Sequence, residues 1–233
     1  MTNSISQLEA RAGLYAALAM GFDYPDDDNE WELLTASLKS AGARLENSNG
    51  LGAALHHLGQ AVDETRASSI VPAEEHTFLF ARQSPCPPYE SAYIDAGRGH
   101  SLADVAGFYR AFGFQIAPDA HQLPDHISSQ LEFMAVLCAK EAYALQHGLS
   151  EQAEICRDAR RTFLLEHLGF WTAVFAARVK STARLPLYPA LAELVRAVLT
   201  HESHELKVEL PRLPELEQPV VESDEESEIQ CAA

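Results

Sequence analysis

The clearest helical pattern of the chain runs from Pro124 to Gly148 and reads PDHISSQLEFMAVLCAKEAYALQHG. Its apolar residues recur at steps of three and four, as in Ile127, Leu131, Met134 and Cys138. This spacing places them on one face of an α-helix, where a continuous stripe can be buried against a core. Because a proline precedes the stripe and a glycine follows it, the sequence predicts one long helix between the two.

Apolar residues keep this helical spacing through most of the chain on both sides of that stretch. Further helices are expected in residues 5–22, 31–38, 50–69, 72–80, 102–112, 150–175 and 190–203. Alternation of apolar and polar residues, which marks a half-buried strand, is absent over any useful length. We therefore predict an all-α fold, with a single helical-bundle domain of roughly eight to ten helices over residues 1–212.

Composition and charge restrict the class of partner. The 233 residues are 47% hydrophobic, which suffices for one sizeable core, and the formal net charge is −17. Such a charge repels nucleic acid phosphates and anionic lipid headgroups, so we expect no nucleic acid partner and no stable membrane insertion. The sequence shows no signal peptide and no C-x-x-C pair among its four cysteines. These features favour a cytoplasmic location.

Acidic residues are concentrated at the end of the chain. Residues 213–233 contain seven Asp and Glu residues and no Lys or Arg. A segment with this composition buries too little apolar surface to fold, so we predict a disordered acidic tail. One functional hypothesis follows directly, in which the protein is a generic acidic adaptor that binds folded partners through this tail.

The segment Pro85–Tyr93 (PCPPYESAY) is the strongest anomaly of the sequence. Its three prolines exclude a regular helix and stiffen the chain, while two tyrosines make it more apolar than an ordinary loop. Tyr89 and Tyr93 could pack on the core or supply contact area for a ligand. Glu90 could accept a bidentate hydrogen bond from an arginine. Packing and binding both remain open for this loop.

Asp125 and His126 precede the long helix. Asp125 stands where a helix N-cap belongs, so capping alone explains its presence. The helix dipole disfavours a protonated imidazole in the first turn, so His126 is expected to be neutral and able to exchange hydrogen bonds with a ligand. A histidine that only faces solvent would explain the residue at this position equally well.

Motifs of catalysis and of metal or phosphate binding are missing. The ten histidines include no H-E-x-x-H pair, and the sequence has neither a G-x-S-x-G elbow nor a phosphate-binding glycine loop. We therefore expect no catalytic residue, no metal and no cofactor, and we interpret the chain as a binding protein. The alternative is a small helical metal-dependent hydrolase that uses His126 with Asp125 or Glu132.

Six short motifs in order give the chain a family resemblance. They are Glu75–Phe80 (EHTFLF), Pro87–Tyr93 (PPYESAY), Phe108–Gly113 (FYRAFG), Pro124–Met134, Phe163–Trp171 and Tyr188–Leu194. Together they resemble the TorD/DmsD/NarJ superfamily of redox-enzyme maturation chaperones. His76 departs from the family pattern, which has an aromatic Tyr or Trp at this position.

The resemblance implies an all-α chaperone without a catalytic reaction. The implied partner is the catalytic subunit of a molybdenum-dependent oxidoreductase, bound through its twin-arginine signal peptide, in its apo form, or both. Binding would assist insertion of the molybdopterin cofactor before export, by a monomer or a homodimer. The family's peptide contacts and the anomalous loop together predict client-binding residues Leu79, Phe80, Pro88, Tyr89, Glu90, Tyr93, Asp125 and His126.

Overall fold

The computed structural model describes residues 2–25, 30–45, 50–81, 84–94, 98–117 and 122–211. Over these residues the prediction of an all-α fold is confirmed, and their one β-type feature is an isolated antiparallel bridge between Tyr89 and His126. The acidic segment 213–233 lies outside the described part of the chain, so its predicted disorder stays a prediction.

The described helices follow one another without an intervening sheet. They are α1 (Thr2–Gly21), α2 (Glu30–Gly42), α3 (Leu51–Arg66), α4 (Pro72–Phe80), α5 (Arg98–Ala111), α6 (Ile127–Gln146), α7 (Ser150–Phe163), α8 (Gly169–Thr182) and α9 (Leu187–Leu206), with short turns of 3-10 helix at Glu90–Ala92 and of π-helix at Leu164–Leu168. Among these helices, none is both long and apolar enough to cross a lipid bilayer.

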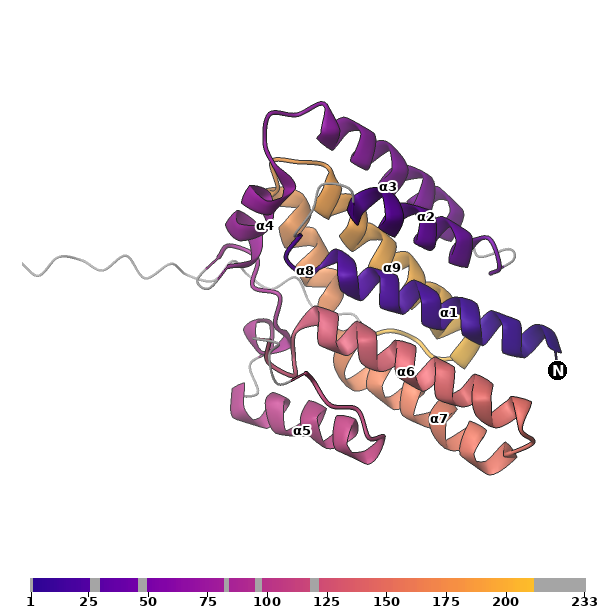
Figure 1. The fold of residues 1–233 in the computed structure, drawn as a ribbon. Helices are drawn as coiled ribbons and strands as arrows, with labels where there is room; N and C mark the ends of the chain where they lie inside the picture. The colour runs from indigo at the N-terminus through magenta and orange to yellow at the C-terminus, as the bar shows by residue number, and fades with distance from the viewer. Residues whose placement is uncertain are drawn as a thin grey trace, which may run out of the picture.

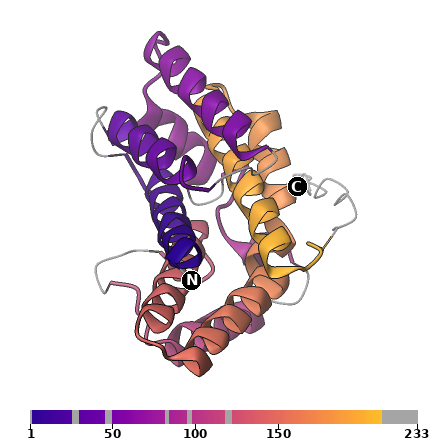
Figure 2. The same cartoon turned by 90° about the vertical axis from the view of Figure 1, so that its right-hand side faces the viewer.

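Helix α1 connects two halves of the bundle. It packs against α6 and also against α2, while α6 packs in turn against α7. Helix α9 packs against both α3 and α8. In Figures 1 and 2 the first and the last helices of the chain therefore lie in one body, and their buried residues form one core.

Helix α6 begins and ends close to the predicted positions. Gly148 follows it with a φ of 72°, a left-handed conformation that favours glycine and commonly ends a helix. Its inward face is buried along its length, including Ile127, Leu131, Met134 and Cys138. The periodicity of the sequence thus identified the buried face of this helix correctly.

The predicted helix over residues 150–175 is interrupted, which the sequence did not indicate. The segment Leu164–Leu168 forms a π-helical turn between α7 and α8. Such a turn adds one residue to the helical register and so changes the direction of the side chains on it. A Cβ atom at Gly169 would collide with the carbonyl of Leu164, so glycine is needed where the turn closes. His167 on this turn is buried.

A cluster of buried charges, here called the Arg160 cluster, ties four helices together. Arg160 on α7 donates hydrogen bonds to Glu141 on α6 and to Glu202 on α9. Arg11 on α1 lies with its Nε 3.6 Å from a carboxylate oxygen of Glu202. All four side chains are buried, so each charge relies on its partners in place of water.

Candidate functional site

The loop of residues 84–94, here called the Tyr89 loop, pairs directly with the start of α6. Tyr89 and His126 form the isolated β-bridge, and their rings meet edge to face at 5.1 Å. The flanking hydrogen bonds run from Glu90 N to the Asp125 carbonyl (3.0 Å) and from Ile127 N to the Pro88 carbonyl (2.9 Å). Two segments that the sequence singled out separately therefore form one structural unit.

Asp125 and His126 do not have the roles expected of them. His126, not Asp125, is the N-cap of α6, because its Nδ1 accepts a hydrogen bond of 3.2 Å from Ser128 N. Asp125 is fully buried, and its Oδ2 accepts a hydrogen bond of 3.1 Å from Ser91 N in the loop. The prediction of an Asp125 cap was wrong because the bridge to the loop turns this carboxylate away from the helix.

His126 is neutral, as expected, but for a different physical reason. Burial, together with a smaller effect of the nearby His76 ring, lowers the pKa of its ring to about 3. Its Nδ1 is already used as the helix cap, so this atom is not available to a ligand. The Tyr89–His126 pair thus presents a neutral, largely apolar surface.

Glu90 lies inside the protein, with 1% of its surface exposed. Its Oε1 lies 3.0 Å from His167 Nδ1, and its Oε2 accepts a hydrogen bond from Gln130 Nε2. The amide oxygen of Gln130 in turn accepts a hydrogen bond of 3.1 Å from Trp171 Nε1. We call Glu90, Gln130, His167 and Trp171 the Glu90 network. In this arrangement Glu90 anchors the loop and does not face an arginine outside the protein.

The other predicted residues also support the loop from within. Tyr93 is buried and stacks on Trp171 with ring centroids 5.3 Å apart, while the Arg178 guanidinium lies 4.9 Å from the Tyr93 ring centroid. Leu79, Phe80 and Pro88 are buried as well. Of the predicted set, Tyr89 alone is not buried, and it is only partly exposed, so the others lie behind the surface that a ligand would meet.

His76 stands in a cluster of rings on α4, beside the start of α6. Its ring centroid lies 5.1 Å from that of Phe80, 5.5 Å from Tyr24 and 5.9 Å from Tyr188. A ring nitrogen lies 3.1 Å from the Phe22 carbonyl, and burial lowers the pKa of the ring. The histidine therefore fills an aromatic position in an uncharged form, which explains how it replaces the family's Tyr or Trp.

The outer surface of this region comes from residues that the sequence did not mark as client-binding, although Glu132 was named for the hydrolase alternative. We call them the rim: Met20, Asp23, Tyr24, Leu123 and Glu132. The apolar members are exposed, Met20 by 65%, Tyr24 by 56% and Leu123 by 38%. Asp23 accepts a hydrogen bond of 2.6 Å from Gln122 Nε2, which links the end of α1 to the segment before α6.

The two carboxylates of the rim lie close enough to influence each other. Partial burial raises the pKa of Glu132, and the negative charge of Asp23 raises it further. A cation placed between them would relieve this repulsion. The rim therefore combines an acidic pair with exposed apolar groups at the end of the bundle where α1 ends and α6 begins (Figure 1).

The hydrolase alternative gains no support from this geometry. Among the described residues, no group of three or more His, Cys, Asp or Glu side chains is arranged to hold a metal ion. His126 uses Nδ1 as a helix cap, and Asp125 uses Oδ2 to hold the Tyr89 loop. His126 and Asp125 thus have structural roles, and Glu132 lies on the rim.

Comparison with known proteins places this site in a family. Residues 45–177, which include the Tyr89 loop, the start of α6 and the π-helical turn, match the model of the nitrate reductase delta subunit family. The chain belongs to this family. The resemblance to the TorD/DmsD/NarJ superfamily is thereby confirmed.

Individual proteins are also similar to this chain. The selenate reductase assembly chaperone protein of Thauera selenatis is 33% identical over 93% of this chain and 100% of its own length. The chlorate reductase assembly chaperone protein of Ideonella dechloratans is 32% identical over 87% of this chain and 93% of its own. Chaperone protein TorD of Vibrio cholerae is 30% identical over 54% and 57%, respectively. These relatives are named as chaperones and not as enzymes.

Proposed function

We propose that this protein is a cytoplasmic chaperone for the catalytic subunit of a molybdenum-dependent oxidoreductase. It binds the subunit's twin-arginine leader peptide, its apo form, or both, and assists cofactor insertion before export without catalysing a reaction. The observation that carries the proposal is the match, over 100% of that relative's length, to a selenate reductase assembly chaperone. The chlorate and perchlorate reductase assembly chaperones support the same class of client.

The leader peptide would bind across the rim and the Tyr89–His126 pair. A twin-arginine leader has a basic start followed by an apolar run. Asp23 and Glu132 supply the negative charge for the arginines, and Met20, Tyr24 and Leu123 supply the exposed apolar area. The formal net charge of −17 favours encounter with a basic peptide.

The buried residues of the predicted set would act by holding this surface in place. Glu90, Tyr93 and Asp125 fix the Tyr89 loop against α6, α8 and the π-helical turn. Phe80 is part of the ring cluster around His76, and Leu79 is buried next to it in α4. Their substitution is expected to weaken peptide binding through movement of the loop, without loss of a direct contact.

Calorimetric titration with a synthetic leader tests the proposal. The peptide carries two adjacent arginines followed by a run of leucine and alanine, and a second peptide has alanine at both arginine positions. Tyr24→Ala and Tyr89→Ala should weaken binding of the first peptide about tenfold or more, because aromatic contacts carry much of the affinity at such surfaces. The matched control is Tyr143→Ala, whose side chain is 60% exposed on α6.

Two results would reject the proposal. One is equal affinity for the two peptides, which would show that the protein does not contact the two arginines. The other is unchanged peptide affinity in Tyr24→Ala and Tyr89→Ala, which would show that the peptide does not bind at this surface. Ending the chain after Pro214 separates the chaperone from the acidic adaptor, because the adaptor hypothesis requires the tail for binding and the proposal does not.

A further inference from the structure

His167, on the π-helical turn, lies between two carboxylates from different elements. Its Nδ1 is 3.0 Å from Oε1 of Glu90 in the Tyr89 loop, and its Nε2 is 3.6 Å from Oδ2 of Asp104 in α5. The histidine side chain is 3% exposed, whereas the Asp104 side chain is 53% exposed. The ring is therefore enclosed by the protein, and one of its two partners also reaches water.

The charge of the ring decides whether it can serve both carboxylates. A neutral imidazole has one N–H donor and one lone pair, whereas an imidazolium has two N–H donors. When the neutral ring donates from Nδ1 to Glu90, the lone pair on Nε2 faces the oxygen of Asp104, and the two repel each other. The protonated ring donates to Glu90 and attracts Asp104 at the same time. The link between His167 and Asp104 therefore requires the imidazolium.

The side chains that pack directly on the imidazole ring are uncharged. The rings of Phe108 from α5 and Phe163 from α7 have centroids 5.4 and 5.0 Å from that of His167. Helices α6 and α8 face the same region with Gln130 and Trp171, which complete the Glu90 network and are uncharged as well. The two carboxylates thus dominate the electrostatic environment of the ring.

Other ionisable groups of this region do not replace either carboxylate. Tyr109 of α5 is neutral, because burial, together with the negative charges of Glu90, Asp125 and Glu132, raises the pKa of its hydroxyl well above the usual value. Glu166, on the π-helical turn itself, is exposed, so solvent screens its charge.

Helix α5 lies at the edge of the molecule (Figure 1) and contacts both parts of the proposed leader site. It packs against the 3-10 turn Glu90–Ala92 of the Tyr89 loop. The hydroxyl of Tyr109 donates a hydrogen bond of 2.7 Å to the carbonyl of Pro124, which directly precedes Asp125. The position of α5 therefore affects how the Tyr89 loop lies against the start of α6.

We propose that His167 is a positioning residue for the leader site, whose imidazolium form ties α5 to the Tyr89 loop and whose neutral form releases Asp104 to solvent. This rests on the proposed function, which supplies the leader as ligand. His167 does not touch the leader and acts through Glu90 and Asp104. Leader affinity should therefore be higher at pH 6, where an ordinary imidazole is mostly protonated, than at pH 8, where it is neutral.

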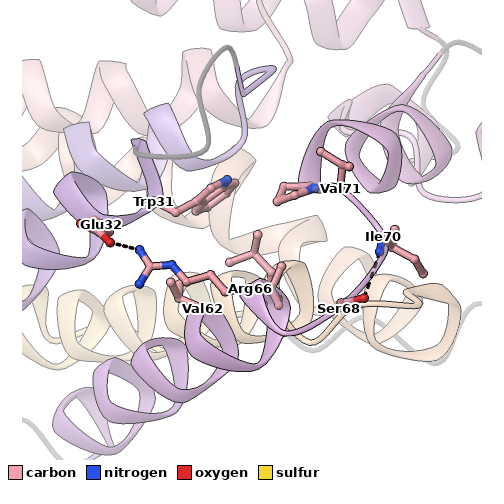
Figure 3. Close-up of a pocket in the computed structure, with 10 residues that line it drawn as sticks. Trp31, Glu32, Val62, Arg66, Ser68, Ile70 and Val71 are labelled. Carbon is pink, nitrogen blue, oxygen red and sulfur yellow. Dashed lines mark hydrogen bonds and ion pairs between the residues drawn. The ribbon is translucent and has the colours of Figure 1, made fainter.

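An ion pair at the cavity between α2, α3 and the start of α4 shows what distinguishes the His167 pair. There Arg66 pairs with Glu32, and both side chains are about half exposed (Figure 3). An arginine keeps its charge at pH 6 and at pH 8, so this pair is the same at both. The cation of the His167 pair forms by protonation, so this pair responds between the two values.

Titration of the leader at pH 6 and pH 8 tests the proposal. The probe is the synthetic peptide with two adjacent arginines and a run of leucine and alanine. In the wild type its affinity should fall about threefold from pH 6 to pH 8, the effect expected for loss of one partly exposed ion pair. Asp104→Asn should bind at pH 6 as weakly as the wild type does at pH 8, and its affinity should change little between the two.

Two further variants separate the effect of Asp104 from that of charge in general. Asp104→Glu keeps a carboxylate within reach of Nε2, so it should restore the dependence on pH. Glu166→Gln removes an exposed carboxylate from the π-helical turn and should leave this dependence unchanged. His76 and His126 do not account for the difference, because burial lowers the pKa of both rings and neither is altered in Asp104→Asn.

Amide hydrogen exchange of α5 gives a second measurement, without leader. At pH 6, Asp104→Asn should lower the protection factors of residues 102–111 about threefold, whereas at pH 8 the variant and the wild type should agree. The proposal is overturned if leader affinity depends on pH equally in the wild type and in Asp104→Asn, or if protection of α5 at pH 6 is the same in both.

The proposed function and the role of His167 can fail separately. If the peptide binds at neither pH while Asp104→Asn still loosens α5 at pH 6 and not at pH 8, the proposed function fails and the link between His167 and α5 stands. If the peptide binds equally at both pH values and Asp104→Asn leaves α5 unchanged, the role of His167 fails and the proposed function stands.

Discussion

The Glu90 network and the Arg160 cluster both bury charge, but they anchor different parts of the chain. The Arg160 cluster connects side chains of four long helices, which are already held by the hydrophobic core. The Glu90 network holds a loop with little regular structure against α6, the π-helical turn and α8. We infer that the first chiefly determines the stability of the fold and the second determines the shape of the binding surface.

The largest expected effect is at the Arg160 cluster. Arg160→Met leaves Glu141 and Glu202 buried without their cation, which should lower the free energy of unfolding by about 3–5 kcal/mol. Urea denaturation measures this loss. Arg161→Met is the control, because its ion pair with Asp158 is exposed and should contribute less than about 1 kcal/mol. Similar losses of unfolding free energy in the two variants would show that burial of an ion pair does not determine its contribution to stability.

A smaller loss of stability with a larger loss of binding is expected at Glu90. Glu90→Ala removes the carboxylate that pairs with Gln130 Nε2 and His167 Nδ1, so unfolding should become easier by about 1–3 kcal/mol. Leader affinity should fall about tenfold because the Tyr89 loop loses its anchor. Calorimetry and urea denaturation on the same sample test the pair of effects. If Glu90→Ala binds the leader peptide as tightly as a folded Arg160→Met variant does, the Glu90 network does not determine the shape of the binding surface.

His126 should make the stability of the protein sensitive to mild acid. The unfolded chain protonates this ring below about pH 6.5, whereas the folded chain, with a pKa of about 3, does not. The free energy of unfolding should therefore fall as the pH decreases between these values, by at most about 1.4 kcal/mol per pH unit from this group. His126→Asn keeps a capping side chain and should show a shallower fall. Equal slopes in the two proteins would contradict the neutral, buried state of His126.

The smallest expected effect is at the acidic pair of the rim. Asp23→Asn and Glu132→Gln should each weaken binding of the twin-arginine peptide about threefold to tenfold, and the effect should shrink at high salt. Stability should change little, because neither carboxylate anchors the loop. Titrations at low and high salt measure both effects. A loss that is independent of salt would argue for a packing role.

The sequence predicted those features that depend on neighbouring residues. Periodicity gave the all-α class and the buried face of α6, and Gly148 marked its end. The π-helical turn was missed because one extra residue in the register leaves no compositional signal in an apolar helix. The capping role of His126 was missed because it depends on the pairing of the loop with Asp125.

The sequence predicted which segments form the candidate site, but not which way their side chains point. The sequence identified the Tyr89 loop and the start of α6, but it could not show that Glu90 and Asp125 point inward. The rim was missed because its two segments, joined by the hydrogen bond between Gln122 and Asp23, are distant in the chain and meet only in the folded protein. Tyr24, beside Pro25, was not singled out because the sequence does not show that its side chain is 56% exposed at the end of α1.

Amide hydrogen exchange, measured with and without saturating twin-arginine peptide, locates the peptide-binding surface on the chain. We expect protection of residues 20–25, of the Tyr89 loop and of residues 122–128, with no change around the Arg160 cluster. Protection confined to residues 153–160 and 202–206, or no protection anywhere in the chain, would contradict this expectation.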